Sequence, residues 1–165
     1  MLGAQPIEDA VHHAQAFVAA LAPVDGTVVD LGSGGGLPGL VIAWRRPDLR
    51  LILIDRRTTR ADHLRRLVRS LELDVAVLAV DAAELPAGFA SQFGSGPVEA
   101  VVARGFGSPV ATAVTAAPLL AVGGRLVVSE PPSNDPSRWP ATMLASLGLT
   151  RLQHTDRRVM VATRR

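Results

Sequence analysis

Thr27–Gly39, with the sequence TVVDLGSGGGLPG, is the stretch that decides the fold of this chain. Residues 27–31 are rich in β-branched and apolar side chains, a composition typical of a buried strand. A run of glycine and serine follows, and Pro38 stands at the predicted first turn of a helix, where a missing backbone N–H costs nothing. The stretch therefore predicts a strand, a glycine loop and a helix N-terminus, an arrangement that brings backbone N–H groups close to a ligand.

The glycine spacing fits more than one ligand. Gly34-x-Gly36-x-x-Gly39 matches the dinucleotide fingerprint, whereas Gly32-x-Gly34-x-Gly36 matches the loop of adenosylmethionine-dependent methyltransferases. A tight strand-to-helix turn without any ligand is a third interpretation. Asp30, two residues before the first glycine, favours the methyltransferase loop, because a carboxylate there can order the loop and attract an amine-bearing ligand but would repel a pyrophosphate.

Acidic residues close the next two predicted strands. Residues 51–54 form an apolar run that ends at Asp55, roughly 20 residues after the loop, where a carboxylate can accept ribose hydroxyl protons. A plain helix cap is the alternative role for Asp55. Residues 75–80 precede Asp81, which can accept from an adenine amino group while the N–H of Ala82 donates to the ring. Loop glycines, a ribose acid and an adenine acid at successive strand ends favour adenosylmethionine as cofactor.

The rest of the chain alternates strands and helices. Beyond those named, predicted strands cover residues 98–103, 125–129, 149–155 and 158–163, and predicted helices cover residues 6–21, 38–45, 60–71, 110–120 and 139–147. Thr58 or Thr59 is the expected cap of the helix 60–71, and Gly123-Gly124 is the expected turn before the strand 125–129. This alternation predicts an α/β fold, a three-layer Rossmann-like sheet that is mostly parallel with an antiparallel C-terminal strand. We expect the class I methyltransferase strand order 3-2-1-4-5-7-6 in a single domain, 1–165, with residues 1–26 preceding the sheet.

Composition excludes several classes of function. No apolar run reaches the roughly 18 residues that a membrane span needs, and the chain opens without a signal-like layout. Cysteine is absent, which excludes disulfides, thiolate metal sites and thiol nucleophiles. We therefore expect a cytoplasmic protein with no membrane contact and no metal site.

Charge is unevenly distributed along the chain. All 17 basic residues are Arg, so a formal net charge of only +2 gives a pI near 10.8. Nine of them fall between Arg45 and Arg69, whereas residues 71–102 contain acids and no basic residue. The Arg-rich segment is either a phosphate-facing patch or a solvated helix face. If RNA is the substrate, we expect Arg56, Arg57 and Arg60 to contact phosphates.

Two segments resemble a known family. DLGSGGGLPGL at residues 30–40 and RRPDLRLILID at residues 45–55 are similar to the small-subunit (16S) ribosomal RNA guanine-N7 methyltransferases, the glucose-inhibited division protein B family. Val102–Phe106 is similar to a conserved segment of that family, and His13 matches a His in its N-terminal helical region. The resemblance implies adenosylmethionine as cofactor and ribosomal RNA as partner.

The motifs and the resemblance together give a set of expected site residues. We expect Arg104 to lie beside the transferred methyl group, holding the substrate or the cofactor carboxylate; the alternative is a structural pairing with Asp30 or Glu130. The expected cofactor-binding residues are Asp30, Gly32, Ser33, Gly34, Gly36, Pro38, Asp55, Arg56, Asp81, Ala82 and Arg104.

Departures from the family pattern keep other functions open. Glu130-Pro131 stands where the family has a Lys-Gly pair, and Thr59 and His63 replace a Lys and an aromatic residue. These changes are compatible with a non-catalytic or partner-dependent adenosylmethionine-binding homologue, or with a small-molecule methyltransferase. A nicotinamide-dependent oxidoreductase is a weaker alternative. The sequence leaves the oligomeric state open.

Overall fold

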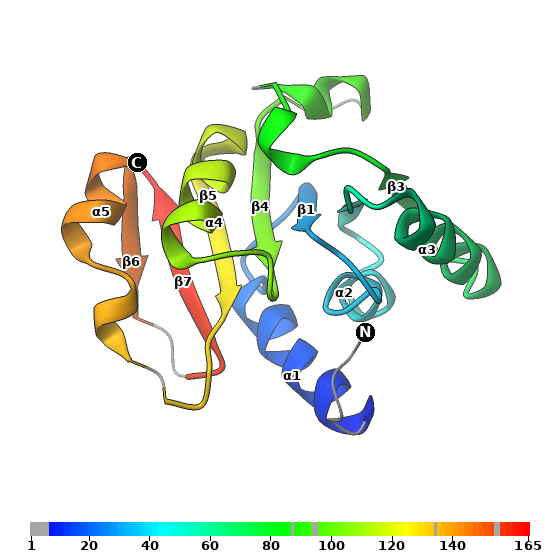
Figure 1. Cartoon of the computed structure of the whole chain (residues 1–165), viewed down its shortest axis with the longest axis horizontal. Helices are drawn as coiled ribbons and strands as arrows, with labels where there is room; N and C mark the ends of the chain where they lie inside the picture. Colours follow the sequence, from blue (N-terminus) through cyan, green and yellow to red (C-terminus); the bar gives the residue numbers. More distant parts are fainter. Residues whose placement is uncertain (1–6, 87, 94–95, 134, 154–155) are drawn as a thin grey trace.

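A computed structural model describes residues 7–86, 88–93, 96–133, 135–153 and 156–165 of this chain. Its seven strands form one sheet in the order β3-β2-β1-β4-β5-β7-β6 (Figure 1). Strands β1 to β5 run parallel, and β7 pairs antiparallel with both β5 and β6. The predicted fold class, strand order and antiparallel C-terminal strand are therefore confirmed.

The elements have the following bounds. The strands are Thr27–Leu31 (β1), Arg50–Ile54 (β2), Val75–Leu78 (β3), Val98–Ala103 (β4), Leu120–Ser129 (β5), Leu149–Leu152 (β6) and Val159–Arg164 (β7). The α-helices are Ile7–Ala20 (α1), Gly39–Arg45 (α2), Thr58–Ser70 (α3), Pro109–Ala116 (α4) and Ala141–Ser146 (α5). Short 3-10 helices cover Ala82–Glu84, Phe89–Phe93, Ala117–Leu119 and Pro136–Arg138.

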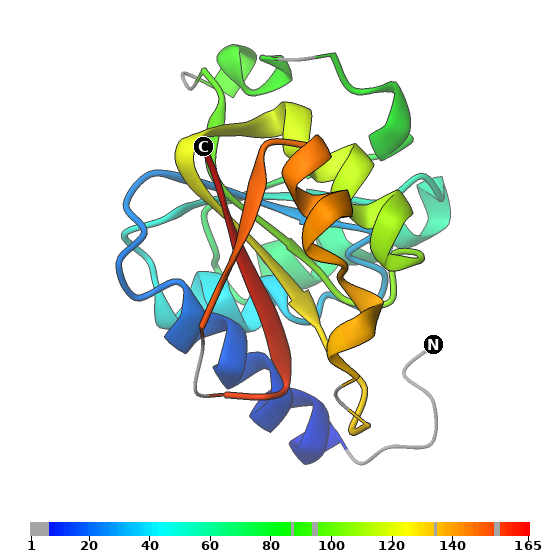
Figure 2. The ribbon, with the colours of Figure 1, turned by 90° about the vertical axis from the view of Figure 1, so that its left-hand side faces the viewer.

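Helices cover both faces of the sheet, with α1 on one side and α4 and α5 on the other (Figure 2). Alternate residues of a strand point to opposite faces, so β1 contributes to both cores. Val28 packs in a cluster with Phe17 of α1 and Ile42 of α2, whereas Val29 packs in a cluster with Ala113 of α4. All five residues of β1 are buried, as expected for a central strand of a doubly covered parallel sheet.

The largest error in the predicted elements concerns β5. The sequence predicted a turn at Gly123-Gly124, but β5 begins at Leu120 and passes through both glycines, with a register shift against β4. Gly123 has φ +82°, and a Cβ on Gly124 would lie 2.8 Å from the carbonyl oxygen of Ala121. The two glycines therefore permit an irregularity inside β5, at a point where two backbone segments lie very close together.

Smaller differences occur at helix and strand ends. Pro38 is the N-cap of α2 and not its first residue, and Arg57 occupies the N-cap of α3, where Thr58 or Thr59 was expected. β3 ends at Leu78, two residues early, and α5 begins at Ala141 after Pro140. Pro6, the predicted start of the first helix, lies outside the described residues.

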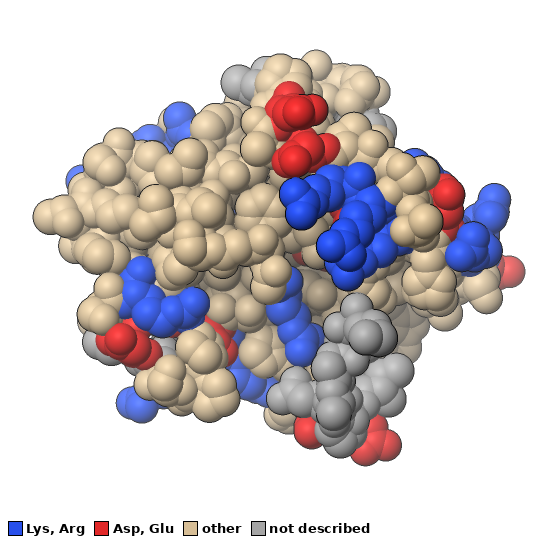
Figure 3. All heavy atoms as spheres, in the orientation of Figure 1, with Lys and Arg blue, Asp and Glu red and all other residues tan. Residues whose placement is uncertain are grey.

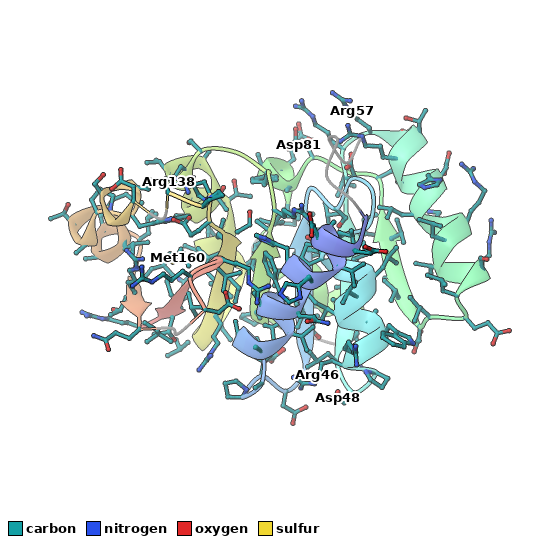
Figure 4. The ribbon with its side chains drawn as sticks, turned by 90° about the horizontal axis from the view of Figure 1, so that it is seen from below. Arg46, Asp48, Arg57, Asp81, Arg138 and Met160 are labelled. Atoms are coloured by element: carbon teal, nitrogen blue, oxygen red, sulfur yellow. The ribbon has the colours of Figure 1, made fainter. Side chains whose placement is uncertain are left out.

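The strand register places the expected site residues side by side. Leu31 is opposite Ile54 on one side and Ala103 on the other, so Gly32, Asp55 and Arg104 each follow directly at the same edge of the sheet. Arg57 and Asp81 lie near each other at one edge of the molecule, and Arg46 and Asp48 lie at the opposite edge (Figure 4). The candidate residues therefore gather at the carboxyl ends of the strands, where ligands bind in open α/β sheets.

Candidate active site

Ser33 anchors the glycine loop to the end of β2. Its backbone N–H donates to the carbonyl of Ile54 at 2.9 Å, and its hydroxyl oxygen accepts from the Ile54 N–H at 3.1 Å. The same hydroxyl donates to the carbonyl of Asp30 at 2.9 Å. Ser33 is thus a buried residue of the loop itself, and its three hydrogen bonds fix the loop's position.

Asp30 is the second anchor of the loop. Its carboxylate Oδ2 accepts a hydrogen bond from the backbone N–H of Gly39 at 3.1 Å, which joins the end of β1 to the first residue of α2. Burial raises the pKa of Asp30 to about 7, and the Gly39 hydrogen bond opposes that rise. This hydrogen bond places Asp30 to order the loop, as its position predicts. The side chain is buried and does not line the pocket described below, and its approach to an amine-bearing ligand stays a prediction.

Asp55 holds the loop from the side of β2. Its Oδ2 accepts from the N–H of Gly34 at 2.9 Å, and its Oδ1 accepts from the N–H of Arg57 at 2.9 Å. A carboxylate has about four lone-pair sites, so each oxygen keeps capacity for one further donor. The Arg60 Nη1 atom lies 3.9 Å from Oδ2, and Asp55 itself is 4% exposed.

A pocket of about 420 Å³ opens at these strand ends. Gly32, Asp55 and Asp81 line it from the ends of three neighbouring strands, and Phe106 and Thr115 line it from the β4–α4 side. Gly32 has φ +68°, and a Cβ there would lie 3.0 Å from Phe106 Cδ2, so glycine permits the two loops to approach. The volume falls within the range of small-molecule and cofactor sites.

Asp81 and Ala82 form the β3 side of the pocket. The Asp81 carboxylate caps the short helix Ala82–Glu84 by accepting from the N–H of Ala83 at 3.0 Å. Asp81 and Ala82 line the pocket from the β3 side, whereas Phe106 lines it from the β4–α4 side. The cap leaves lone pairs of the carboxylate available to a donor such as an adenine amino group.

Arginine side chains border the pocket beside Asp55. Arg56, Arg57 and Arg60 contribute to its lining from the start of α3. Figure 3 shows basic side chains gathered on this face of the molecule, with acidic side chains next to them. Further along α3, Arg65 is engaged by the Asp62 carboxylate at 2.8 Å and the Val77 carbonyl at 3.1 Å. The Arg65 guanidinium is therefore engaged within the chain, whereas the arginines at the start of α3 border the pocket.

Arg104 does not line this pocket, and its contact with the transferred methyl group, the substrate or the cofactor carboxylate stays a prediction. Its Nη1 atom is buried without a hydrogen-bond partner in the described part of the chain, as is Nε2 of His13. Burial and the nearby positive charge of Arg104, and of Arg158, lower the pKa of His13, whereas Asp156 raises it. Asp30 and Glu130, the expected pairing partners of Arg104, bond instead to Gly39 and to Arg138 and Trp139.

The structure thus brings only part of the expected set into one pocket. Gly32, Asp55, Arg56, Asp81 and Ala82 line it, whereas the remaining expected residues lie beneath or beside it: Asp30, Ser33, Gly34, Gly36, Pro38 and Arg104. Sequence reasoning missed the wall formed by Gly105–Gly107 with Ala111 and Thr115 of α4. The Gly-Phe-Gly triplet at residues 105–107, close behind a buried strand, was the sequence feature that could have indicated this side of the pocket.

Among the residues that the structure describes, no group of three or more His, Cys, Asp and Glu side chains is placed to hold a metal ion. No helix there is both long and apolar enough to cross a bilayer.

Comparison with known families and curated proteins identifies relatives of this chain. Residues 7–131 match the family described as rRNA small subunit methyltransferase G, GidB. The ribosomal RNA small subunit methyltransferase G of Salinispora arenicola is 40% identical over 109 residues, covering 64% of this chain and 44% of that protein. The protein of the same name from Frankia casuarinae is 39% identical over 111 residues, covering 67% of this chain and 37% of that protein. The chain thus spans less than half the length of these relatives.

Solved structures share the fold at low sequence identity. The Thermus thermophilus 16S rRNA N2 G1207 methyltransferase, in complex with AdoMet and guanosine, superposes with a TM-score of 0.69 at 20% identity, covering 99% of this chain and 45% of that chain. An O-methyltransferase family protein from Burkholderia thailandensis gives a TM-score of 0.65 at 18% identity, covering 95% of this chain and 57% of that chain. The match over residues 7–131 covers most of the sequence, and the chain belongs to the rRNA small subunit methyltransferase G (GidB) family.

Proposed function

We propose that this chain is an adenosylmethionine-dependent methyltransferase that acts on guanine N7 of small-subunit ribosomal RNA in the cytoplasm. The observation that carries the proposal is the pocket that joins the glycine loop, Asp55 and Asp81 at three adjacent strand ends. Membership of the GidB family supports the reaction class and the RNA substrate.

The pocket lining suits an adenosyl group. Asp81 and Ala82 offer an acceptor and a backbone N–H to the edge of an adenine, and Asp55 offers its remaining lone pairs to ribose hydroxyls. Gly32 and Phe106 line the pocket toward β4, where the methionyl end of the cofactor would lie. Pro38, Ser33 and Asp30 would act indirectly, by holding the loop in shape.

The reaction itself needs little from side chains. Adenosylmethionine supplies a methyl group on a sulfonium: the N7 lone pair forms the new bond to carbon, and the electrons of the breaking carbon–sulfur bond stay on sulfur. Guanine N7 carries no proton, so no general base is required. The protein's contribution is then to hold the acceptor in line with the methyl group, an effect of about 7–11 kcal/mol in well-oriented systems.

The test is transfer of a labelled methyl group from adenosylmethionine into small-subunit ribosomal RNA that lacks the modification, both naked and within small subunits. Borohydride–aniline cleavage of the product maps N7-methylguanosine, so we expect label and cleavage at the same nucleotide. Label at another atom would contradict the guanine N7 assignment. Failure of the folded protein to bind adenosylmethionine in a calorimetric titration would contradict the reaction class.

A cofactor-binding homologue without methyltransferase activity, or one dependent on a partner, is the second candidate. It is favoured by Glu130-Pro131, which stands where the family resemblance implies a Lys-Gly pair. Cofactor binding together with no label in any RNA or small-molecule pool would support this candidate, whereas repeated turnover would exclude it.

A further inference from the structure

A second pocket adjoins the first at the carboxyl ends of β4 and β5. It has a volume of about 280 Å³ and shares Gly105, Phe106 and Gly107 with the first pocket. Its other walls include Glu130, directly after β5, together with Arg138 and Trp139. In Figure 4, Arg138 lies apart from Arg57, toward the β5–β7 half of the molecule. The two pockets therefore divide the strand ends between them, with Phe106 on their common boundary.

Glu130 is held rigidly in this second pocket, yet one of its oxygens is unused. Its Oε1 accepts from Arg138 Nη1 at 2.9 Å and from Trp139 Nε1 at 2.8 Å. Its backbone N–H donates to the carbonyl of Arg158 at 2.7 Å. The residue is 5% exposed, and Oε2 is buried without a hydrogen-bond partner among the described residues. A buried carboxylate oxygen without a donor is costly, so the site favours a ligand that brings N–H groups to it.

We infer that Glu130 recognises the hydrogen-bond donor edge of a guanine base in this second pocket. The inference rests on the proposed function and names the residue that selects its substrate base. Guanine carries two adjacent donors, N1–H and the 2-amino group, and one carboxylate oxygen has lone pairs for both. Adenine and cytosine place a ring acceptor beside their amino group, and uracil flanks its single N–H with two carbonyls. A carboxylate therefore discriminates in favour of guanine by attraction to its donors and repulsion of the other edges.

The same contact orients the base for the proposed chemistry. The N1 and 2-amino groups lie on the six-membered ring, at the end of guanine opposite N7. A base held at Glu130 by that edge has N7 free to face the boundary that the second pocket shares with the first. Phe106, which is partly exposed, supplies aromatic surface on which a base can stack. The negative charge of Glu130 also favours the positive charge that the base acquires on N7 methylation.

The fluorescence of Trp139 can report directly on whether a base binds beside Glu130. The chain has two tryptophans, and Trp44 is 66% exposed on α2 with the Arg45 guanidinium 4.6 Å from its ring centroid. A Trp44→Phe background leaves Trp139, which is 2% exposed and bonded to Glu130, as the single tryptophan. Nucleoside monophosphates are titrated with the first pocket filled by S-adenosylhomocysteine, whose own binding is measured first by calorimetry.

We expect guanosine monophosphate to change Trp139 fluorescence and to bind about ten-fold or more tightly than inosine monophosphate, which lacks the 2-amino group. The 7-deaza analogue should bind as guanosine monophosphate does, because it keeps the donor edge, whereas the 1-methyl analogue should bind at least ten-fold more weakly. Glu130→Gln should remove the preference for guanosine over inosine. Glu84→Gln, an exposed glutamate in neither pocket, is the matched control and should retain it.

Equal affinities for guanosine, inosine and 1-methylguanosine monophosphates would overturn the inference. If Glu130→Gln does not fold, as judged by its thermal melt, the analogue series on the Trp44→Phe protein decides the question alone. Failure of S-adenosylhomocysteine to bind would contradict the proposed function. In that case the base preference would still be measured from Trp139 fluorescence, with nucleotides titrated into the protein alone.

Discussion

The Asp55 carboxylate accepts a hydrogen bond from the Gly34 backbone N–H at 2.9 Å, so the end of β2 holds the glycine loop that follows β1. The same oxygen lies 3.9 Å from the Arg60 guanidinium, which contributes to the lining of the first pocket. One side chain therefore shapes the loop and borders the proposed cofactor site. Its removal should affect ligand binding through both roles.

Asp55→Ala should weaken adenosylmethionine binding by about 1.5–3 kcal/mol, roughly ten- to a hundred-fold, because charge-assisted hydrogen bonds to the ribose are lost. Isothermal titration calorimetry measures the change. Asp62→Asn is the matched control, since Asp62 is exposed and pairs with Arg65 on the outside of α3. Unchanged affinity in a folded Asp55→Ala protein would remove Asp55 from the cofactor site.

Replacing Arg57 and Arg60 by Gln should lower RNA affinity and flatten the log-affinity versus log-salt slope by about one to two units, because fewer counterions are released. The matched control is Arg66→Gln with Arg69→Gln, two exposed positions further along α3. Filter binding across a salt series measures both slopes. Equal flattening by both pairs would indicate a diffuse charge effect, and no change in either would exclude α3 from the RNA surface.

Asp30 predicts a pH dependence of stability. Burial raises its folded pKa to about 7 from an ordinary value of 3.8, so its stabilising contribution is complete below pH 3.8 and is lost as pH rises toward and through 7. Relative to Asp30→Asn, the native protein should lose up to about 1.4 kcal/mol of unfolding free energy per pH unit in this window. Urea denaturation at several pH values measures it. Parallel pH curves for the two proteins would show that Asp30 does not titrate in this range.

Gly39→Ala should destabilise the fold by about 1–3 kcal/mol through overpacking. A Cβ at this position would collide with Leu53 Cδ2 and lie 2.6 Å from the Asp30 carboxylate oxygen. Gly35→Ala is the control in the same loop, because a Cβ there has no heavy atom within 4 Å. Thermal unfolding of both variants gives the comparison, and equal melting temperatures would contradict the close packing of α2 on β1.

Arg104→Gln should raise the pKa of His13. Burial lowers that pKa most, and the positive charges of Arg104 and Arg158 lower it further, against the opposing effect of Asp156. An NMR titration of the imidazole signals measures the shift, with Arg69→Gln on the far part of α3 as the control. A His13 pKa unchanged by Arg104→Gln would show that the two side chains are electrostatically independent.

The local sequence around β1 and β2 was sufficient to predict the strand–loop–helix unit and the acids that follow the strands. Apolar runs that end at glycine or aspartate are local signals, so Gly32, Asp55 and Asp81 could be assigned to one edge of a parallel sheet before the fold was known. The Gly123-Gly124 pair was misread because a turn and a strand irregularity use the same residues, and only the partner strand distinguishes them.

By itself the sequence determined the α/β fold and the set of acids at the strand ends, because hydrophobic periodicity and glycine placement are properties of contiguous residues. The strand order was expected from the class I methyltransferase fold that this pattern of elements matches. Only the tertiary structure decided that the Asp30 and Ser33 side chains are buried and anchor the loop while Asp55 borders the pocket. It alone brought Trp139 and Arg138 onto one oxygen of Glu130 and left the other oxygen without a described partner. Burial and the pairing of hydrogen-bond donors with acceptors depend on which distant segments meet, and that information is absent from any single stretch of the chain.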